Sequence, residues 1–351
     1  MNVLMCCSDL SYKGGMVSVL KGYLGYSGWH DIDITFVPTH RDAGKAELIT
    51  YFAKAYSRIL SLAVRKKIDI AHLHTAERGS FIRKAIIALT LKRFGIPVVM
   101  HHHGAEFEEY SASASPRLKR FIKKVLTEVD TNIVLSNRLT DMIRSKAPDA
   151  RVDVVYNAVS LPPVNPYNPD GKSITLLGRL GKRKGAYDLL KAISMIDTQI
   201  EPDVRFNLCG DGETDEVRIE AERLGIAHRI GHIGWIDGDD KRALIADTII
   251  NVLPSYNEGL PMTILETMAQ GIPSVTTRIA SIPEVVDDGI NGYMIEPGDI
   301  VALADTLKSL ANNRELRITL SRNAFATISE RFSLPKSIDR LEKIYHSLTA
   351  R

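Results

Sequence analysis

Short apolar runs recur along the chain, and stretches with helical spacing of apolar residues separate them. Such runs predict buried strands, because a strand inside a parallel sheet carries apolar residues on both faces. Strands that alternate with helices favour parallel, doubly wound α/β sheets. The expected strands are Val3–Cys7, Ile34–Val37, Ile70–Leu73, Val98–His101, Thr131–Leu135, Val152–Val155, Ile174–Gly178, Phe206–Cys209, Ile249–Leu253, Ser274–Thr276 and Tyr293–Ile295.

A proline-rich segment interrupts this alternation near the middle of the chain. Residues 161–171 hold four prolines and no periodicity, which is typical of a semi-rigid linker. A chain of 351 residues is also long for a single hydrophobic core. We therefore expect an N-terminal Rossmann-like domain over 1–163, a linker over 164–171 and a second Rossmann-like domain over 172–334.

Two glutamates flank the start of a predicted helix in the second domain. Pro261 suits the first turn of a helix and Gly271 the position just past its end, which predicts a helix over 261–270. Glu258 would then lie in the loop before the helix, among backbone N–H groups that favour an anion. Glu266 would lie inside the helix.

Glu266 would share a helix face with Met262 and Thr263. The two carboxylates would thus bracket an anion-binding helix end, which suits a ligand with phosphates in the middle and hydroxyls on both sides, as in a sugar nucleotide. The alternative is structural, since a glutamate at a helix start stabilises the helix dipole and one inside a helix is often only solvated.

Four cations lie between another expected strand and the helical stretch after it. Because α/β folds bind ligands at the carboxyl ends of strands, this loop is a second candidate anion site. Arginine can bind a phosphate with two hydrogen bonds, and lysine adds a point charge. A solvated basic turn is the alternative. The four residues are Arg179, Lys182, Arg183 and Lys184.

Taken together, these motifs resemble the family 4 glycosyltransferases, retaining enzymes of the GT-B fold. The matching C-terminal motifs are Gly178-Arg179-Leu180, Lys184-Gly185, Cys209-Gly210-Asp211-Gly212, and Asn257-Glu258-Gly259-Leu260-Pro261 with Glu266; the others are Gly14-Gly15, His103-Gly104, Asn157-Ala158-Val159 and Phe332-Ser333. The resemblance implies α/β architecture with two doubly wound domains facing a cleft, and a last helix within 335–351 that packs back onto the first domain.

The resemblance also implies a nucleoside diphosphate sugar as donor. Arg179, Lys184 and the N–H groups near residues 260–263 would stabilise the charge on the departing diphosphate. Glu258 would hold the hydroxyls of the transferred sugar and Glu266 those of the ribose. Retention implies attack from the side of the leaving group, with the diphosphate taking the acceptor proton. No protein nucleophile is then required.

His103 ends an expected strand, and the resemblance implies that it faces the cleft near the transferred sugar. Glycines after the first strand let the backbone approach a phosphate at a helix start, although a glycine pair alone is usually a tight turn. The expected donor-binding residues are Gly14, Gly15, Gly259, Leu260, Met262, Thr263 and Glu266.

No metal or cofactor is expected. Neighbouring histidines in 101–103 would point to opposite faces of a strand. His72 and His74 could share a face but have no nearby third ligand. The aspartates in 237–240 and 287–288 are interpreted as turns rather than metal ligands. We expect cationic side chains and helix ends to serve in place of a divalent ion.

Charge is unevenly divided. Residues 1–164 hold 23 Lys/Arg and 15 Asp/Glu, or +8, whereas the remainder holds 22 and 27, or −5. A basic N-terminal half suggests an anionic partner. The segment 116–126 predicts a helix with an apolar stripe and a basic face, capped by Ser115. It could dock on its own sheet or touch anionic lipid. Nucleic acid is not expected, because no nucleic-acid motif accompanies the charge.

Localisation is expected to be cytoplasmic, peripheral at the inner membrane face if lipid contact occurs. No apolar stretch approaches the roughly 20 residues that span a bilayer, and the N-terminus lacks a secretion signal. Cys6, Cys7 and Cys209 lack metal spacing and are expected to be buried free thiols.

The expected activity is retaining transfer to a glycan acceptor on a polyprenyl lipid, in surface polysaccharide or O-antigen synthesis. Two alternatives remain open. One is another GT-B enzyme, a phosphorylase or sugar-nucleotide epimerase; the other is a non-catalytic binder of sugar nucleotides. The dinucleotide pattern G-x-G-x-x-G and the P-loop pattern are absent from the expected strand-to-helix turns, which counts against a dehydrogenase or an NTPase.

Overall fold

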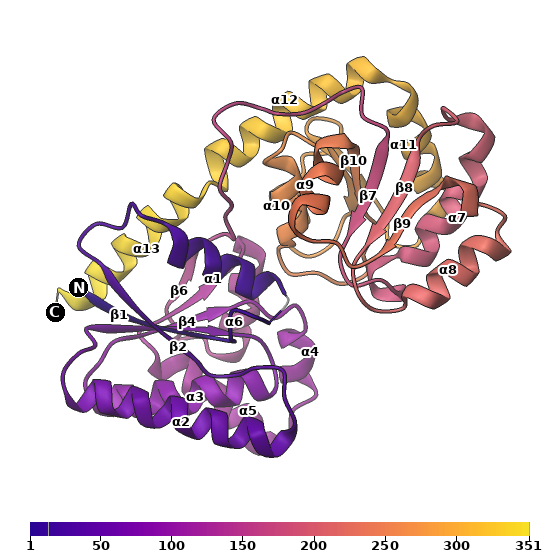
Figure 1. Cartoon of the computed structure of the whole chain (residues 1–351). Coiled ribbons are helices and arrows are strands. Elements are labelled where there is room, and N and C mark those ends of the chain that lie inside the picture. The colour runs from indigo at the N-terminus through magenta and orange to yellow at the C-terminus, as the bar shows by residue number, and fades with distance from the viewer. Residues whose placement is uncertain (13, 351) are drawn as a thin grey trace. The chain divides into compact units, whose positions relative to one another are not determined.

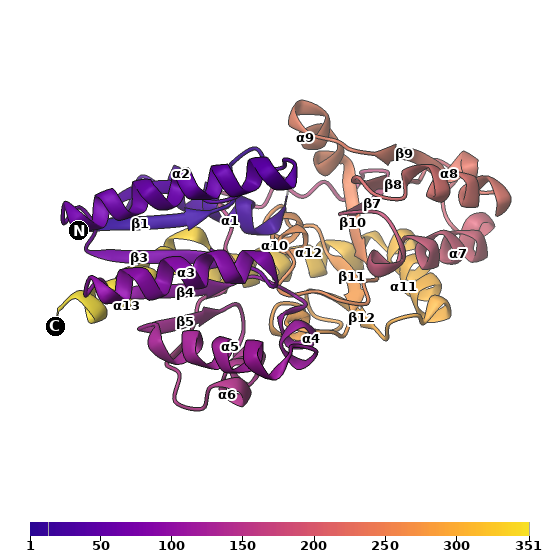
Figure 2. The ribbon, with the colours of Figure 1, turned by 90° about the horizontal axis from the view of Figure 1, so that it is seen from below.

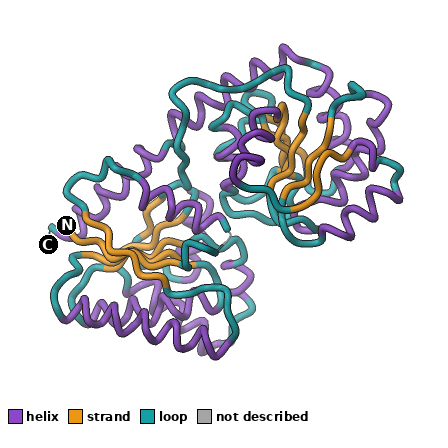
Figure 3. The backbone as a smooth tube through the Cα atoms, viewed as in Figure 1, coloured by secondary structure: helices purple, strands orange, loops and turns teal. Residues whose placement is uncertain are grey.

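The chain forms two compact units in the computed structural model, which describes residues 1–12 and 14–350. The N-terminal unit comprises Met1–Ala158 and returns at Leu334, while the C-terminal unit comprises Val159–Ser333. Figure 1 follows the chain by colour, and Figure 3 shows that each unit contains its own sheet. The chain leaves the N-terminal unit ahead of the expected linker 164–171. That segment packs on the C-terminal unit, where the Tyr167 hydroxyl donates to the Ile249 carbonyl at 3.0 Å.

The N-terminal unit is built on one parallel sheet of six strands in the order β2-β1-β3-β4-β5-β6. Parallel strands buried on both faces explain the continuous apolar runs of the sequence. The strands are β1 (Asn2–Cys7), β2 (Asp33–Pro38), β3 (Ile70–Thr75), β4 (Val98–His102), β5 (Thr131–Val134) and β6 (Val152–Val154).

Helices cover both faces of this sheet. In Figure 1, α1 (Gly15–Gly25) and α13 (Leu334–Thr349) lie on one face. Figure 2 shows α2 (Lys45–Val64), α3 (Gly79–Arg93) and α5 (Pro116–Glu128) side by side on the other. Two further helices, α4 (Phe107–Ala112) and α6 (Asn137–Lys146), complete the unit. The last helix packs on the first unit, where the Tyr345 hydroxyl of α13 hydrogen-bonds the His72 ring of β3.

The C-terminal unit holds a second parallel sheet, in the order β12-β11-β10-β7-β8-β9. Its strands are β7 (Ser173–Leu177), β8 (Arg205–Cys209), β9 (Ile230–Gly234), β10 (Thr248–Leu253), β11 (Ser274–Thr277) and β12 (Gly292–Ile295). All eleven strands predicted from the sequence are present within a residue or two, and β9 was missed. Glycines and a histidine interrupt its apolar run.

Helices α7 (Ala186–Ile196), α8 (Thr214–Arg223) and α11 (Ile300–Asn312) share one apolar core with this sheet. The remaining helices are α9 (Gly238–Asp247), α10 (Met262–Met268) and α12 (Arg314–Arg331). Short 3₁₀ turns occupy η1 (Lys182–Lys184), η2 (Asp197–Gln199), η3 (Ala227–Arg229) and η4 (Ile282–Glu284). The expected turn at residues 237–240 was wrong, because Asp237 is the N-cap position from which α9 begins.

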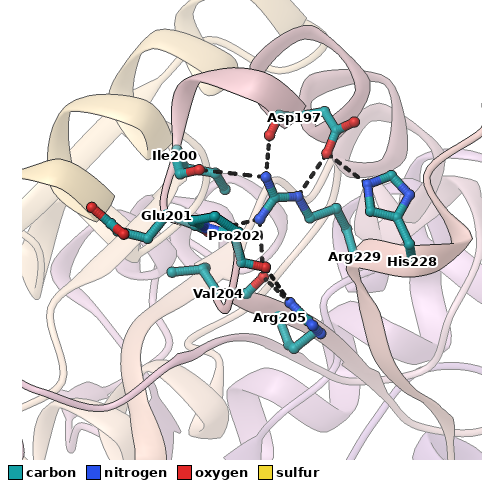
Figure 4. Close-up of polar contacts among 8 residues, drawn as sticks. All are labelled: Asp197, Ile200, Glu201, Pro202, Val204, Arg205, His228 and Arg229. Carbon is teal, nitrogen blue, oxygen red and sulfur yellow. Dashed lines mark hydrogen bonds and ion pairs between the residues drawn. The ribbon is translucent and has the colours of Figure 1, made fainter.

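A buried arginine fastens the turn after α7, as Figure 4 shows. Arg229 donates from Nε to an Asp197 carboxylate oxygen at 2.6 Å. The same guanidinium donates to the carbonyl oxygens of Asp197 and Glu201. Arg229 is 5% exposed, so this ion pair and these carbonyl contacts satisfy a charge that burial would otherwise make costly.

Among the described residues, no helix is both long enough and apolar enough to cross a membrane. All three cysteines are buried and free, as the sequence predicted.

Candidate functional site

Two loops of the C-terminal unit meet at the carboxyl ends of β7 and β10. Gly185 has a φ of +70°, and a Cβ there would lie 2.1 Å from the Pro254 carbonyl oxygen. The Tyr256 N–H donates to the Arg183 carbonyl at 2.9 Å, and the Arg183 guanidinium donates to the Asn257 carbonyl at 3.1 Å. The glycine thus permits a close approach that two hydrogen bonds then fix.

Lys184 and Glu258 form a buried ion pair across these loops. Lys184 Nζ lies 2.5 Å from Glu258 Oε1, and the two side chains are 11% and 7% exposed. The Ser255 hydroxyl donates to the same carboxylate oxygen at 2.7 Å. A Cβ on Gly178 would lie 3.4 Å from Lys184 Cε, so the lysine stem crosses that glycine. From the sequence, Lys184 was expected to bind the diphosphate and Glu258 the sugar hydroxyls. The structure shows that these two side chains also bind each other.

The glycine motif at residues 209–212 packs beside this pair. A Cβ on Gly210 would lie 1.9 Å from the Gly178 carbonyl oxygen, which only glycine allows. Leu180 N–H donates to the Asp211 carbonyl at 2.6 Å. The loop that carries Arg179 is therefore fixed on both sides. Arg179 itself is exposed and, within residues 1–12 and 14–350, forms no hydrogen bond or ion pair.

The start of α10 presents unsatisfied donors. The helix begins at Met262, with Pro261 at the N-cap position rather than in the first turn as expected. Ile264 N–H donates to the Pro261 carbonyl, so the Met262 and Thr263 N–H groups have no acceptor inside the helix. The Thr263 hydroxyl is buried and lacks a partner among the described residues. Gly271 follows the helix with a φ of +70°, as predicted.

Glu266 lies on α10 and pairs with Lys241 of α9, with 3.3 Å between Nζ and Oε2. The two side chains are 40% and 33% exposed, so solvent screens this pair. Both residues line a cavity of about 570 Å³ beside α9, together with Tyr167 and Gln270. Lys241 was not predicted, because nothing in the sequence links residues 25 positions apart. Gly259 is half-buried and Leu260 is buried.

In the N-terminal unit, Gly14 is the N-cap position of α1 and Gly15 its first residue. The Val17 and Ser18 N–H groups donate to the Gly14 carbonyl. A Cβ on Gly14 would meet nothing closer than 4.0 Å, so its backbone faces open space. The helix start is thus accessible to a ligand.

His103 follows β4 and belongs to a column of imidazoles on β3 and β4. Its Nε2 lies 2.9 Å from His74 Nδ1, and His72 Nε2 lies 3.0 Å from His101 Nδ1. Burial, with smaller contributions from the neighbouring imidazoles of His72 and His102, lowers the pKa of His103 to about 3. His103 is therefore neutral at pH 7, where it can donate or accept a hydrogen bond but carries no charge.

The expectation that His72 and His74 have no nearby third ligand was wrong, because His101 lies beside them. Parallel pairing of β3 with β4 sets His74 opposite His101, and ligand nitrogens of these three residues lie within 4.8 Å of one another. However, the His72 and His74 rings stack at 4.4 Å with only 11° between their planes. A metal ion lies in the plane of each imidazole that binds it, so stacked rings do not converge on one ion. These residues form a hydrogen-bonded stack.

The glycosyltransferase expectation is borne out by comparison with known proteins. The family model described as "Glycosyltransferase Family 4" matches residues 27–161, and that described as "Glycosyl transferases group 1" matches residues 161–327. The chain belongs to the family 4 glycosyltransferases.

Characterised relatives align over most of this glycosyltransferase. N-acetyl-alpha-D-glucosaminyl L-malate synthase of Bacillus anthracis is 26% identical, over 83% of this chain and 78% of the relative. UDP-Gal:alpha-D-GlcNAc-diphosphoundecaprenol alpha-1,3-galactosyltransferase of Escherichia coli is 24% identical, over 83% of this chain and 79% of the relative.

The two six-stranded parallel sheets place the enzyme in the GT-B fold class. Its fold is similar to that of the Anabaena protein HepE, solved in complex with UDP. The two share a TM-score of 0.76 and 18% identity, over 99% of this chain and 100% of the other.

Proposed function

We propose that this glycosyltransferase is a retaining enzyme that transfers a sugar from a nucleoside diphosphate sugar to a glycan carried on a polyprenyl lipid. The observation that carries the proposal is the buried Lys184–Glu258 pair, together with Arg179 in the neighbouring loop, which has no partner among the described residues. These groups stand at the carboxyl ends of β7 and β10, the edge at which α/β sheets bind ligands.

The departing diphosphate would be stabilised by three kinds of donor. Arg179 is exposed and, in the part of the chain that the structure describes, unpaired, and its guanidinium suits two-point binding of a phosphate. Lys184 uses one N–H on Glu258 and keeps two for a ligand. The Met262 and Thr263 N–H groups add the positive end of a helix. Donors fixed in place before the reaction stabilise developing charge without reorganisation.

The two glutamates would bind hydroxyls on either side of the diphosphate. Glu258 is held by Lys184 and Ser255 through one oxygen, Oε1, so its other oxygen is available to hydroxyls of the transferred sugar. Glu266 would hold the ribose once it releases Lys241. His103 of the N-terminal unit would offer a neutral hydrogen bond to a sugar hydroxyl, a role taken from the family resemblance.

Membership of this family supports a retaining mechanism. The bond between the anomeric carbon and the diphosphate oxygen would break as the acceptor oxygen approaches from the same face. The acceptor proton would pass to the leaving diphosphate. This chemistry needs no protein nucleophile.

The donor and acceptor classes rest on relatives. The Anabaena structure holds UDP, and the Escherichia coli relative is named for a UDP-sugar donor and a diphosphoundecaprenol-linked acceptor. We therefore place uridine diphosphate sugars and polyprenyl-diphosphate-linked glycans first among the substrates, in a surface polysaccharide pathway. The Bacillus relative is named for L-malate, a small anionic acceptor.

Transfer would not depend on a divalent cation. Three of the aspartates considered as metal ligands already have partners: Asp237 accepts from the Trp235 indole, Asp239 pairs with Arg242, and Asp288 pairs with Arg278. The chelator EDTA should leave turnover unchanged. Loss of activity that Mg²⁺ or Mn²⁺ restores would contradict this part of the proposal.

A panel of nucleoside diphosphate sugars, incubated with and without lipid-linked glycans and followed by mass spectrometry, tests the proposal. Transfer should need both substrates, and the anomeric configuration of the new bond should match that of the donor by NMR. Conversion of the sugar nucleotide alone would indicate an epimerase, and dependence on orthophosphate a phosphorylase. Binding of UDP without any turnover would indicate a non-catalytic protein.

A further inference from the structure

The N-terminal unit contains a lysine that the catalytic proposal does not use. Lys84, on the second turn of α3, is 0% exposed. Its Nζ has no hydrogen-bond partner among the described residues. A buried ammonium without a partner is costly, and most buried charges in proteins are paired. The side chain therefore needs a specific explanation.

The neighbours of Lys84 do not neutralise it. Its charge lowers the pKa values of Cys6 and Cys7 at the end of β1, but burial raises them to about 12 and 11, so both thiols are uncharged at neutral pH. Burial is the main cause that lowers the pKa of His40, which follows β2, and the positive charge of Lys84 lowers it further. The ammonium thus lies near the carboxyl ends of β1 and β2, without a countercharge from these residues.

A second cation lies beside it. A Cβ on Gly79 would stand 3.2 Å from Arg83 Nη1, so the Arg83 side chain folds back over the first residue of α3. Arg83 is half-buried, its Nε has no partner, and it forms no ion pair within the described part of the chain. The first N–H groups of this 15-residue helix add positive potential at the same end.

Two carboxylates lie in the neighbourhood. Glu77 Oε2 is also buried without a hydrogen-bond partner among the described residues, and it lies against Gly104, where a Cβ would be 1.9 Å away, so this carboxylate faces the loop after β4. Asp42 acts on His40. Neither forms an ion pair with Lys84 or Arg83 in the described residues. The positive charge of the two cations is therefore left for a ligand.

We propose that Lys84, Arg83 and the amino end of α3 bind a phosphate group of the acceptor. The proposal rests on the proposed function and identifies the residues that would hold the phosphate of such an acceptor. Burial lowers the pKa of Lys84 to about 8, so most of the lysine is charged at pH 7 even without a ligand, and a bound phosphate would favour the charged form further.

Lys84→Met tests this directly, with Lys92→Met as control. Lys92 lies on the same helix but already pairs with Asp130 at 2.7 Å. The probes are inorganic pyrophosphate, orthophosphate and a polyprenyl phosphate in detergent, and binding is measured by calorimetry and thermal shift. Pyrophosphate should stabilise the wild-type protein. Its affinity should fall about tenfold or more in Lys84→Met, the loss expected for a charge-assisted contact, and stay unchanged in Lys92→Met.

The apo-proteins give an independent readout. Lys84→Met should melt at a higher temperature than wild type because it removes an unpaired buried charge, whereas Lys92→Met should melt lower. If Lys84→Met does not fold, Arg83→Gln provides the same affinity test from a half-buried position. Wild-type affinity for pyrophosphate in both variants, or no phosphate binding by the wild-type protein, would overturn the proposal.

Two further measurements distinguish a lipid-linked phosphate from a small phosphorylated acceptor, and a failure of this proposal from a failure of the proposed function. Binding of the polyprenyl phosphate more tightly than the inorganic anions would identify a lipid-linked acceptor, and equal affinity a small phosphorylated one. UDP binding, assigned to the C-terminal unit, should be the same in wild type and Lys84→Met. If the wild-type protein does not bind UDP, that result would count against the proposed function, not against the phosphate site.

Discussion

Both units are built on a six-stranded parallel sheet, although the strand orders differ, and the units also differ in whether their buried lysine is paired. In the C-terminal unit, Lys184 is paired with Glu258 and Arg229 with Asp197. In the N-terminal unit, Lys84 Nζ and the Nε2 atoms of His74 and His101 have no partner among the described residues. Unsatisfied buried polar groups are rare in folded proteins and point to a ligand or a functional constraint. The buried lysine of the C-terminal unit is thus already paired, whereas Lys84 of the N-terminal unit keeps a charge that a ligand could balance.

Net charge follows the same division. The N-terminal unit, counted with its C-terminal helix, holds 27 Lys/Arg and 17 Asp/Glu, or +10, while the C-terminal unit holds 18 and 25, or −7. The site proposed for the anionic donor therefore lies in the acidic unit. Local placement of a few cations, rather than overall charge, must provide donor binding there.

The largest effect is expected from breaking the Lys184–Glu258 pair. Glu258→Gln or Lys184→Met should each lower transfer by about 10²-fold or more, because each removes a fixed charge beside the diphosphate. Each should also destabilise the protein by about 3–5 kcal/mol, because one buried charge is left alone. Turnover with saturating donor and unfolding in urea measure the two effects.

The double variant separates the two roles. With both charges removed, stability should recover much of its loss while transfer stays low. Lys172→Met, which removes an exposed ion pair with Asp203 in the same unit, should change neither quantity appreciably. Near-normal turnover in either single variant would remove the basis of the site assignment.

Replacing Arg229 tests whether its buried ion pair with Asp197 stabilises the C-terminal unit. Arg229→Met should reduce the free energy of unfolding by about 3 kcal/mol, because Asp197 and several carbonyl groups lose their donor. Arg223→Met, which removes an exposed pair with Glu220, should cost less than about 1 kcal/mol. An equal loss of unfolding free energy in the two variants would show that the buried Arg229–Asp197 pair contributes no more than an exposed ion pair.

Acid should destabilise the N-terminal unit first. Burial lowers the pKa of His72 to about 3 and that of His102 to about 4, from 6.5. Between these values and 6.5 the unfolded chain binds more protons, so stability is fully present above pH 6.5 and is lost as pH falls. At pH 5, one such imidazole costs about 2 kcal/mol.

Hydrogen exchange between pH 7 and pH 5 would measure this loss unit by unit. The C-terminal unit should change less, because its two histidines, His228 and His232, are not buried. His72→Phe should flatten the pH dependence of the N-terminal unit. Parallel loss of protection in both units would contradict the assignment to the histidine stack.

The sequence predicted the layered fold because burial on both faces leaves a local signature in each strand. It could not predict the Lys184–Glu258 pair, since 74 residues separate the partners and only the packing of two loops brings them together. Likewise, His101 joins His74 through the register of β3 on β4, which strand periodicity does not define. Local patterns thus fixed the elements, and contacts between distant segments determined the chemistry.

Helix α5 shows the same limit. Its Ser115 cap formed as predicted, with the hydroxyl accepting from Leu118 N–H. The amphipathic pattern left open whether its apolar stripe meets the sheet or a lipid. Ile122, Val125 and Leu126 belong to the core of the N-terminal unit, so this stripe is not available for insertion into a bilayer. Any membrane contact through α5 must be electrostatic.

The smallest effect is expected at this basic face. Its five cations are exposed, and among the described residues only Lys124 forms an ion pair, with Glu128 at 3.7 Å. Each can contribute about 1 kcal/mol near an anionic surface, screened by salt. Changing Lys119, Arg120, Lys123 and Lys124 to Gln should weaken sedimentation with anionic vesicles at low salt. Because no apolar side chain inserts, wild-type binding should vanish at high salt.

A control variant that loses the same number of positive charges elsewhere tests whether vesicle binding depends on the basic face of α5. Arg65, Lys66, Lys67 and Arg93 are exposed cations at the ends of α2 and α3. If the membrane contact is made by α5, changing these four to Gln should leave vesicle binding largely intact. Equal losses in the two variants would assign binding to net charge alone. A wild-type protein that ignores anionic vesicles at low salt would exclude the lipid surface and favour a soluble acceptor, for which the phosphate site at Lys84 would remain the recognition element to test.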